Sequence, residues 1–298
     1  KAPSNQRGRD FAIMLAAFNQ LGYSVEWRVI NAADYGRAQR RRRVFFFVFR
    51  NDTKWGKRLH TKYEATLSND VDLNARLECY APYIFEDGLF GRQFPVKGEA
   101  VKKRINANKL DEDIAEVSAN FSDGKMWNSG LMTNGYYYTI ETEPKGDEEA
   151  IPMKKIVVKE NQVPEDYYVD GEKLEKFKYL RGPKKITRTA ANGHTYTFSE
   201  GGMSEYDSLE LPGRTMLTSE GSVNRSTHLL KIDGKYRLIT PIEAERLQDF
   251  PDDWTRYKRN AKGEVVEVSD RMRMFFMGNA LVTGIVKRIG DELQKIDK

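Results

Sequence analysis

Apolar and polar residues form clear patterns near the amino terminus of the chain. Asp10–Leu21 carries apolar residues with the spacing of an amphipathic helix, and Gly22 follows as a stop signal. Tyr23–Ile30 and Val44–Phe49 are apolar-rich runs typical of strands. The segment between these runs is too short for a helical crossover, so we expect the two strands to pair antiparallel.

The connection between the two predicted strands is densely cationic. It opens with a turn-like segment, Asn31–Gly36, and then places Gln39 among Arg37, Arg40, Arg41, Arg42 and Arg43. A cationic loop at the mouth of a strand is suited to hold a phosphate or an electron-rich ring. The alternatives are a basic segment of the nuclear-localisation or heparin-binding type, or a charged face exposed to solvent.

The middle of the chain is less regular. Residues 60–130 give mixed helix and loop signals that predict no definite element. Short strands are predicted at Tyr136–Ile140, Ile151–Val158 and Thr195–Phe198, between charged or Gly/Pro-rich turns. This pattern indicates an irregular, β-rich second domain.

Periodic patterns return towards the carboxyl terminus. His228–Ile232 and Tyr236–Ile239 flank Asp-Gly and predict a hairpin. A helix start is predicted at Thr240, which is the expected N-cap. Pro241 is then the first helical residue, and Glu243 is the partner of Thr240 in a capping box.

The last predicted element runs from Gly278 to Ile296. Leu281, Ile285, Ile289 and Leu293 recur every four residues and give one broad apolar face. Gly278 and Asn279 precede this helix, and we expect Asn279 to cap it.

Composition narrows the class of protein. The chain has 298 residues, 39% of them hydrophobic and 31% charged, and no run approaches the ~20 apolar residues of a membrane span. The amino terminus lacks the apolar segment of a signal peptide. A single cysteine, Cys79, excludes an internal disulfide and a multi-cysteine zinc site. We therefore expect a reducing cytoplasm and no membrane partner.

Charge is unevenly distributed along the chain. Its net charge is +5, whereas residues 1–58 alone carry 13 Lys/Arg against 4 Asp/Glu. A concentrated basic end predicts a polyanionic partner that meets one face of the protein.

Four segments, in this order, resemble motifs of bacterial cytosine-C5 DNA methyltransferases. Gln39–Arg43 resembles the Gln-x-Arg-x-Arg motif, and Arg214–Thr218 resembles the Thr-Leu region that closes the target recognition domain, with Met216 in place of the usual aliphatic residue. Arg237–Pro251 is similar to the motif after that domain, and Gly278-Asn279-Ala280 to the Gly-Asn pair of the final motif.

The resemblance implies an α/β fold: the trailing part of a Rossmann-like methyltransferase sheet, with antiparallel last strands, plus an irregular β-rich target recognition domain. It implies that residues 1–55 belong to the catalytic domain, residues 56–268 form the target recognition domain, and residues 269–298 form a closing helix that returns to the catalytic domain.

The resemblance also implies roles for individual residues in methyl transfer from S-adenosylmethionine to cytosine. Arg43 is expected to reach the flipped cytosine or its catalytic surroundings, and Arg41 to order the site or hold a phosphate. Gln39 is expected to belong to the same catalytic site. Asn279, Ala280 and Leu281 are expected to contact the cofactor. Contacts to double-stranded DNA are expected from Arg37, Arg40, Arg42, Ser199, Glu200, Ser204, Glu205, Thr215, Asn224 and Arg225.

Key family features have no counterpart in this sequence. The family's nucleophilic cysteine follows a proline, its acid belongs to a Glu-Asn-Val triplet, and its cofactor loop is an early glycine-rich turn. Cys79 stands in Leu-Glu-Cys-Tyr and is expected to be a buried small hydrophobe. We therefore expect this chain to be inactive by itself, with an amino-terminal catalytic half in the same gene product or in a separate subunit.

Two other functions remain open from the sequence. One is a DNA-binding specificity module without catalysis, and the other is a structural protein whose arginine loop binds protein or RNA. A restriction-modification methyltransferase is favoured because catalytic-type motifs accompany the basic charge.

Overall fold

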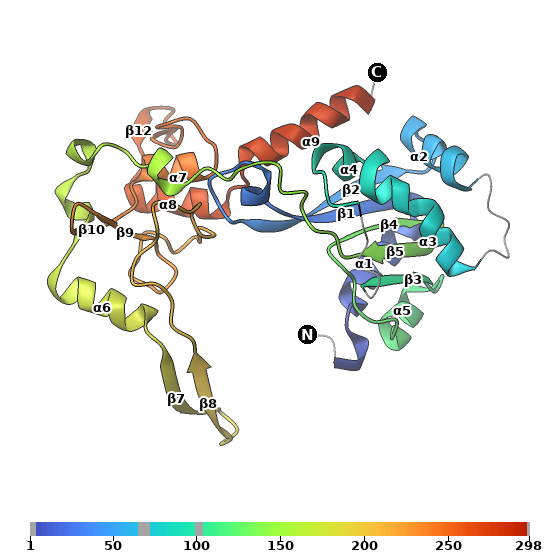
Figure 1. Cartoon of the computed structure of the whole chain (residues 1–298), viewed down its shortest axis with the longest axis horizontal. Coiled ribbons are helices and arrows are strands. Elements are labelled where there is room, and N and C mark those ends of the chain that lie inside the picture. The colour runs from blue at the N-terminus through green and yellow to red at the C-terminus, as the bar shows by residue number, and fades with distance from the viewer. Residues whose placement is uncertain (1–3, 65–71, 99–103, 297–298) are drawn as a thin grey trace. The chain divides into compact units, whose positions relative to one another are not determined.

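The computed structural model describes residues 4–64, 72–98 and 104–296 (Figure 1). The chain forms two compact units. Unit 1 comprises residues 1–31, 42–147 and 287–298, and unit 2 comprises residues 32–41 and 148–286. Residues 56–147 of the predicted recognition domain thus belong to the same compact unit as the first two strands.

A five-stranded sheet forms the centre of unit 1. Its order is β2-β1-β4-β5-β3, and every pairing is antiparallel. The predicted antiparallel pairing of the first two strands is confirmed, with Val25 opposite Val48. The bounds are β1 Tyr23–Asn31, β2 Arg42–Arg50, β3 Ile105–Lys109, β4 Ser129–Thr133 and β5 Tyr136–Ile140.

The two faces of the sheet contribute to two different cores. Trp27 packs with Leu15 of helix α1 (Arg9–Gln20) and with residues of α5 (Ile114–Asn120). A second cluster, rich in tyrosine, gathers α2 (Lys54–Leu59) and α3 (Leu73–Pro82) around residues of β4 and β5. Side chains of a strand point alternately to opposite faces, so both faces of the sheet are covered.

The second face of β1 carries two buried charged residues. The Glu26 carboxylate accepts hydrogen bonds from Leu89 N at 3.0 Å and Phe90 N at 2.9 Å, at the start of α4 (Leu89–Gln93). Burial raises the pKa of Glu26 to about 7, against the lowering effect of the Phe90 amide and the Arg28 guanidinium. Arg28 in turn donates to Phe94 O at 2.9 Å. This pair fixes the α4 segment on the sheet.

Unit 2 is built around a small sheet and two short helices. The predicted hairpin is confirmed as β9 (Leu229–Ile232) and β10 (Lys235–Leu238), and β6 (Tyr168–Val169) adds to its edge. Asp233 and Gly234 form the turn with φ of 48° and 81°. Such positive φ values at both central residues suit a two-residue hairpin loop and explain the Asp-Gly pair.

Helix α7 (Pro241–Leu247) begins as the sequence predicts. Thr240 Oγ1 accepts from Glu243 N at 3.3 Å, and the Glu243 carboxylate accepts from Thr240 N at 2.7 Å, which completes the capping box. The buried Arg237 guanidinium also donates to Glu243, at 2.9 and 2.8 Å. Helix α7 packs with α8 (Asp270–Asn279) around Met216, Leu247 and neighbouring apolar residues.

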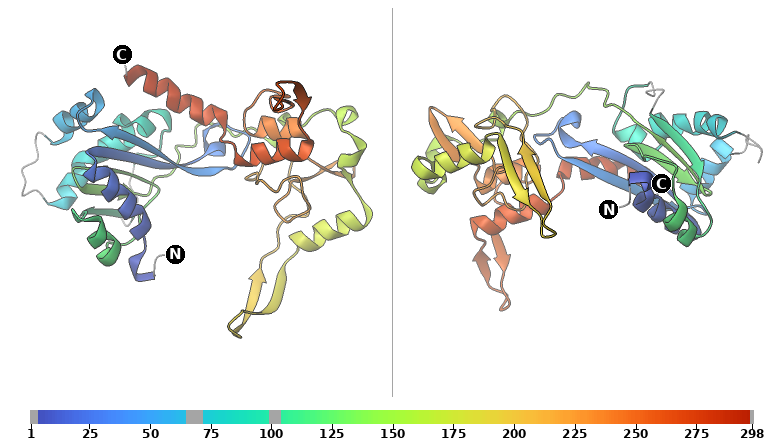
Figure 2. Two further views of the ribbon diagram at one scale, coloured as in Figure 1. Left: turned by 180° about the vertical axis from the view of Figure 1, so that it is seen from behind. Right: turned by 90° about the horizontal axis from the view of Figure 1, so that it is seen from below.

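Two β-ribbons complete unit 2. One is β7 (Lys184–Thr189) with β8 (Thr195–Glu200), which follows helix α6 (Gly171–Arg181), and the other is β11 (Tyr257–Arg259) with β12 (Val265–Glu267). Figures 1 and 2 show the β7–β8 ribbon extending away from the rest of unit 2.

Two predicted elements differ in the structure. Residues 151–158 are not a strand, since Met153–Lys155 form a 3₁₀ turn and Val158 N donates to Glu243. The final element is two helices rather than one: α8 ends at Asn279 and α9 spans Thr283–Ile296. Asn279 therefore does not cap the last helix, because its side chain donates back to Phe275 O at 3.1 Å.

The remaining described elements are single turns. Wide turns of π type lie at His60–Glu64 and Tyr83–Asp87, and 3₁₀ turns at Ser4–Gln6, Ala32–Tyr35, Glu160–Gln162 and Glu165–Tyr167. Among the described residues, no helix is long and apolar enough to span a membrane.

Candidate functional site

The arginine loop and the Arg214–Thr218 segment lie side by side in unit 2. Arg40 N donates to Gly213 O at 2.7 Å, and Gly213 N donates to Ala38 O at 2.8 Å. A Cβ atom at Gly213 would lie 2.6 Å from Leu247 Cδ2, so glycine permits this approach. Thr215 Oγ1 donates to Arg40 O at 2.6 Å and extends the contact.

Gln39 joins this loop to helix α7. Its side chain is completely buried, donates to Leu247 O at 3.1 Å and accepts from Met216 N at 3.0 Å. Both halves of the amide are therefore used. The glutamine of the Gln-x-Arg-x-Arg motif connects three segments that are far apart in sequence.

Arg41 makes the corresponding connection to helix α8. Its guanidinium is buried and donates to Met216 O at 2.8 Å and to Gly278 O at 3.0 Å. A Cβ atom at Gly278 would lie 2.4 Å from Thr218 N, so glycine is required where α8 meets this segment. The buried Arg41 guanidinium therefore connects residue 216 with the end of α8.

The other arginines of the loop have different surroundings. Arg40 and Arg42 are exposed, in agreement with the extended alternation around buried Arg41. Arg43 lies half-buried at the start of β2, where its guanidinium donates to Arg42 O at 2.7 Å.

Arg37 is engaged within the protein. Its guanidinium lies 3.5 Å from the Asp249 carboxylate, next to Gly284. Burial raises the pKa of Asp249, although the charge of Arg37 acts in the opposite direction.

Asn279, Ala280 and Leu281 form the end of α8 and the link to α9. The side chains of Asn279 and Leu281 are exposed, and Ala280 has an extended backbone. These three residues are accessible to a small molecule.

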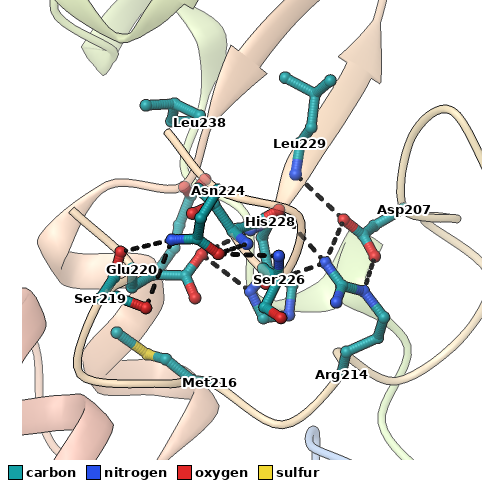
Figure 3. Close-up of polar contacts among 12 residues, drawn as sticks. Asp207, Arg214, Met216, Ser219, Glu220, Asn224, Ser226, His228, Leu229 and Leu238 are labelled. Atoms are coloured by element: carbon teal, nitrogen blue, oxygen red, sulfur yellow. Dashed lines mark hydrogen bonds and ion pairs between the residues drawn. The ribbon is translucent and has the colours of Figure 1, made fainter. Parts of the chain in front are cut away.

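The loop of residues 218–228 is shaped by one asparagine (Figure 3). The Asn224 amide donates to Ser219 O at 2.9 Å and to Ser222 O at 3.2 Å, while its oxygen accepts from Ser226 N and Thr227 N at 2.8 and 3.2 Å. Its polar atoms are occupied in holding the loop, so its geometry favours a structural role over base contact.

A buried ionic cluster supports the same loop and was not anticipated from the sequence. The Asp207 carboxylate accepts from Arg214 Nε at 2.5 Å and from Leu229 N at 3.0 Å (Figure 3). It also accepts from Arg181 at 2.8 Å. Burial by itself raises the pKa of Asp207, but the Arg214 hydrogen bond and the nearby positive charges lower it well below its usual range. No spacing in the sequence connects Arg181 with Asp207, because only folding brings them together.

The predicted base-reading residues lie around the base of the β7–β8 ribbon. Arg225 forms an ion pair with Glu200 at 2.6 Å and donates to Gly201 O. Ser204 Oγ donates to Tyr206 O at 2.7 Å, and Glu205 accepts from Tyr236 at 2.8 Å. Arg225 thus joins the end of the ribbon to the 218–228 loop, and Glu205 joins the segment after β8 to β10.

Comparison with known proteins now places this arrangement in a family. The model of the C-5 cytosine-specific DNA methylase family matches residues 2–295. The chain belongs to this family. The Type II methyltransferase M.Sau3AI of Staphylococcus aureus is 50% identical over 297 residues, which are 100% of this chain and 65% of that protein. M.NlaIV of Neisseria lactamica, also a Type II methyltransferase, is 40% identical over 45 residues, 15% of this chain and 11% of that protein.

Family membership agrees with the family resemblance that the motifs carry. C-5 cytosine DNA methyltransferases use S-adenosylmethionine as the methyl donor. The chain spans 65% of the length of M.Sau3AI, the more similar of these two relatives. The roles of individual residues, and the division into a catalytic and a recognition part, remain predictions.

Proposed function

We propose that this chain supplies the recognition and closing parts of a DNA (cytosine-5-)-methyltransferase of a type II restriction-modification system. The complete enzyme transfers a methyl group to C5 of a cytosine flipped out of a specific duplex sequence. The observation that carries this proposal is the buried Gln39–Arg41 contact to Met216 and Gly278, which joins three of the family's motifs in one unit.

The proposed chemistry needs a nucleophile and a nearby cation. Cytosine C5 is a weak nucleophile, so a cysteine thiolate adds to C6 and produces an enamine at C5. Negative charge develops on the ring during this addition, and a fixed positive group stabilises it. Arg43 is proposed to provide that charge, and Arg41 to position the loop that carries it.

Cys79 does not fit the part of the nucleophile. It is half-buried on α3, and its thiol donates to Tyr63 O at 2.9 Å. It packs against the tyrosine-rich cluster of unit 1. We propose that the reactive thiolate comes from residues outside these 298, on the same polypeptide or on a second subunit.

The cofactor is proposed to meet the link between α8 and α9. Exposed Asn279 and Leu281, with the extended backbone of Ala280, fit a contact to a small molecule. S-adenosylmethionine, when bound, supplies the electrophilic methyl group. Gly278 keeps this link in place through its carbonyl, which Arg41 holds.

Double-stranded DNA is the proposed partner. Extrusion of the target base costs a few kcal/mol, and this cost must be offset by contacts to the remaining duplex. Exposed Arg40 and Arg42 are proposed to bind phosphates. Ser199, Glu200, Ser204, Glu205, Thr215 and Arg225 remain proposed DNA contacts. Arg37 is also a proposed DNA contact, although its guanidinium already pairs with Asp249.

Transfer of a labelled methyl group to mixed-sequence duplex DNA tests this function. The assay compares this chain alone, the upstream Pro-Cys-containing segment alone, and the two together. We expect methylation only when both are present. Activity of this chain alone would refute the proposed source of the thiolate. DNA binding without methylation in any combination would favour a non-catalytic recognition module.

A further inference from the structure

The β7–β8 ribbon has two chemically different faces. Strand alternation and the pairing of Ile186 with Phe198 and of Arg188 with Tyr196 place the apolar and aromatic residues on one face. The opposite face is formed almost entirely of hydroxyl residues. Its members are Lys185, Thr187, Thr189, Thr195, Thr197 and Ser199, and all six are exposed.

On the aromatic face, two cations lie over rings of the ribbon or its base, while Ile186 and Tyr196 are exposed. Arg188 lies over the Phe198 ring at 4.1 Å, and Lys184 lies over the Tyr179 ring at 5.0 Å. Within the described part of the chain, the hydroxyl face makes no corresponding side-chain contacts. An isolated two-stranded hairpin is marginally stable, so a partner bound to the hydroxyl face would also stabilise the ribbon.

The base of the ribbon is firmly held. Arg181, which is buried, donates to Ser204 O at 3.1 Å and to Thr227 O at 2.6 Å, and Arg225 pairs with Glu200. These bonds connect both ends of the ribbon to the 218–228 loop. The ribbon therefore projects from a rigid support (Figure 1).

We propose that the hydroxyl face of the β7–β8 ribbon enters the DNA major groove and reads base edges there. The major groove admits a two-stranded β-ribbon, and threonine offers both a hydroxyl for base edges and a methyl for thymine. Lys185 and Arg188 give the ribbon positive charge, whereas Lys184 is paired with Glu200 at 3.4 Å. This charge favours a polyanion over an apolar protein surface.

This inference rests on the proposed function and changes the expected readers. Glu205, Asn224 and Arg225 are among the DNA contacts expected from the sequence, whereas in the structure their polar groups hold the loop and the ribbon base. Thr187 and Thr197, a directly opposed pair near the middle of the ribbon, become the principal specificity-determining residues.

The test uses the full-length protein and the double variant Thr187→Val/Thr197→Val. Valine keeps the β-branched shape and the strand preference but removes the hydroxyls. The matched control is Ile186→Val on the opposite face. Specificity is measured as kcat/KM for the target duplex divided by kcat/KM for duplexes that differ from it by one base pair. This ratio should fall roughly 10-fold in the double variant and stay unchanged in the control.

A second pair of variants measures DNA binding without methyl transfer. Lys185→Gln should lower the slope of log affinity against log salt by about one, while Lys258→Gln, on the exposed β11–β12 ribbon, should leave it unchanged. Circular dichroism checks that all variants are folded.

The outcomes separate this inference from the proposed function. A wild type that binds DNA without methylating it would contradict the proposed function, and the Lys185 salt slope would still test the ribbon. A wild type that methylates, with unchanged specificity and salt slope in every variant, would overturn the ribbon's role and assign that face to a protein partner.

Discussion

Neighbouring arginines of the 37–43 loop have different surroundings although their side chains are chemically identical. Arg41 is 4% exposed and binds two backbone carbonyls, whereas Arg40 and Arg42 face solvent. Extended backbone alternates the direction of successive side chains, so one of every two arginines is directed inward. Structural and DNA-binding roles are therefore expected to alternate along the motif.

Replacement of Arg41 by methionine should lower the free energy of unfolding by about 3 kcal/mol. The change leaves the buried carbonyls of Met216 and Gly278 without a donor. Arg40→Met is the matched control and should change stability by less than about 0.5 kcal/mol because Arg40 is exposed. Urea unfolding measures both. Equal losses would contradict the positioning role of Arg41.

Arg43→Ala should reduce kcat for methyl transfer by roughly 10²-fold or more in the complete enzyme, because a charge that stabilises the developing anion is lost. Arg42→Ala, at the neighbouring exposed position, should mainly raise KM for DNA. Steady-state kinetics with an unmethylated duplex that contains the target sequence distinguish the two effects. An unchanged kcat in Arg43→Ala would remove the residue from the proposed mechanism.

Glu26 should make stability depend on pH. Its pKa is raised from 4.5 to about 7, so the folded state holds the proton more tightly than the unfolded chain. Its contribution is fully present below about pH 4.5 and is lost as pH rises through about 7, at a cost of about 3 kcal/mol.

Urea unfolding of wild type and Glu26→Gln between about pH 5 and 8 tests this prediction. The difference in unfolding free energy between the two proteins should shrink as pH rises, because glutamine has no proton to lose. Glu112→Gln, at an exposed site, is the control and should follow wild type. A constant difference for Glu26→Gln would contradict the raised pKa.

Helices of unit 2 are positioned by close backbone approach as well as by apolar packing. The carboxyl end of α8 lies against residues 217–218, and Gly278 is the point of contact. The same carbonyl receives the Arg41 guanidinium. Glycine and arginine in two separate motifs thus fix one helix end.

Gly278→Ala should destabilise the protein by about 2 kcal/mol, because the new methyl group would lie 2.5 Å or less from Leu217 C and Thr218 N. Gly290→Ala in α9 is the matched control, since no atom lies within 4 Å of its added Cβ. The control should be neutral or stabilising by up to about 1 kcal/mol. Thermal unfolding compares them, and similar midpoints would refute the steric requirement.

At the scale of the whole molecule, the chain contains two sets of cores. Unit 1 holds the Trp27 and Tyr138 clusters, and unit 2 holds the Met216 cluster. Units with their own buried cores are able to unfold as separate cooperative transitions.

Calorimetry should therefore resolve two transitions. Leu131→Ala removes core volume in unit 1 and Leu247→Ala does so in unit 2, and each should cost about 3 kcal/mol in its own transition. Each variant serves as the control for the other. A single transition shifted equally by both would show that the chain unfolds as one unit.

The sequence by itself determined the local elements whose signals lie within a few residues. The first helix, the β1–β2 pair, the Asp233-Gly234 hairpin and the Thr240 capping box all follow from periodicity, turn chemistry and capping. The motifs also determined the family. Local interactions act over short spans, so the printed order of residues is enough to predict them.

Only the tertiary structure decided which side chains meet across long separations. Gln39 and Arg41 reach residues 216, 247 and 278, and Arg181 reaches Asp207, through contacts that no spacing predicts. The same holds for Ile151–Val158. Its composition is typical of a strand, but the segment is not a strand in the structure, where Val158 N donates to Glu243. Burial in a specific core and pairing of buried polar groups outweigh local preference at these positions, because an unpaired buried group costs more than a propensity difference.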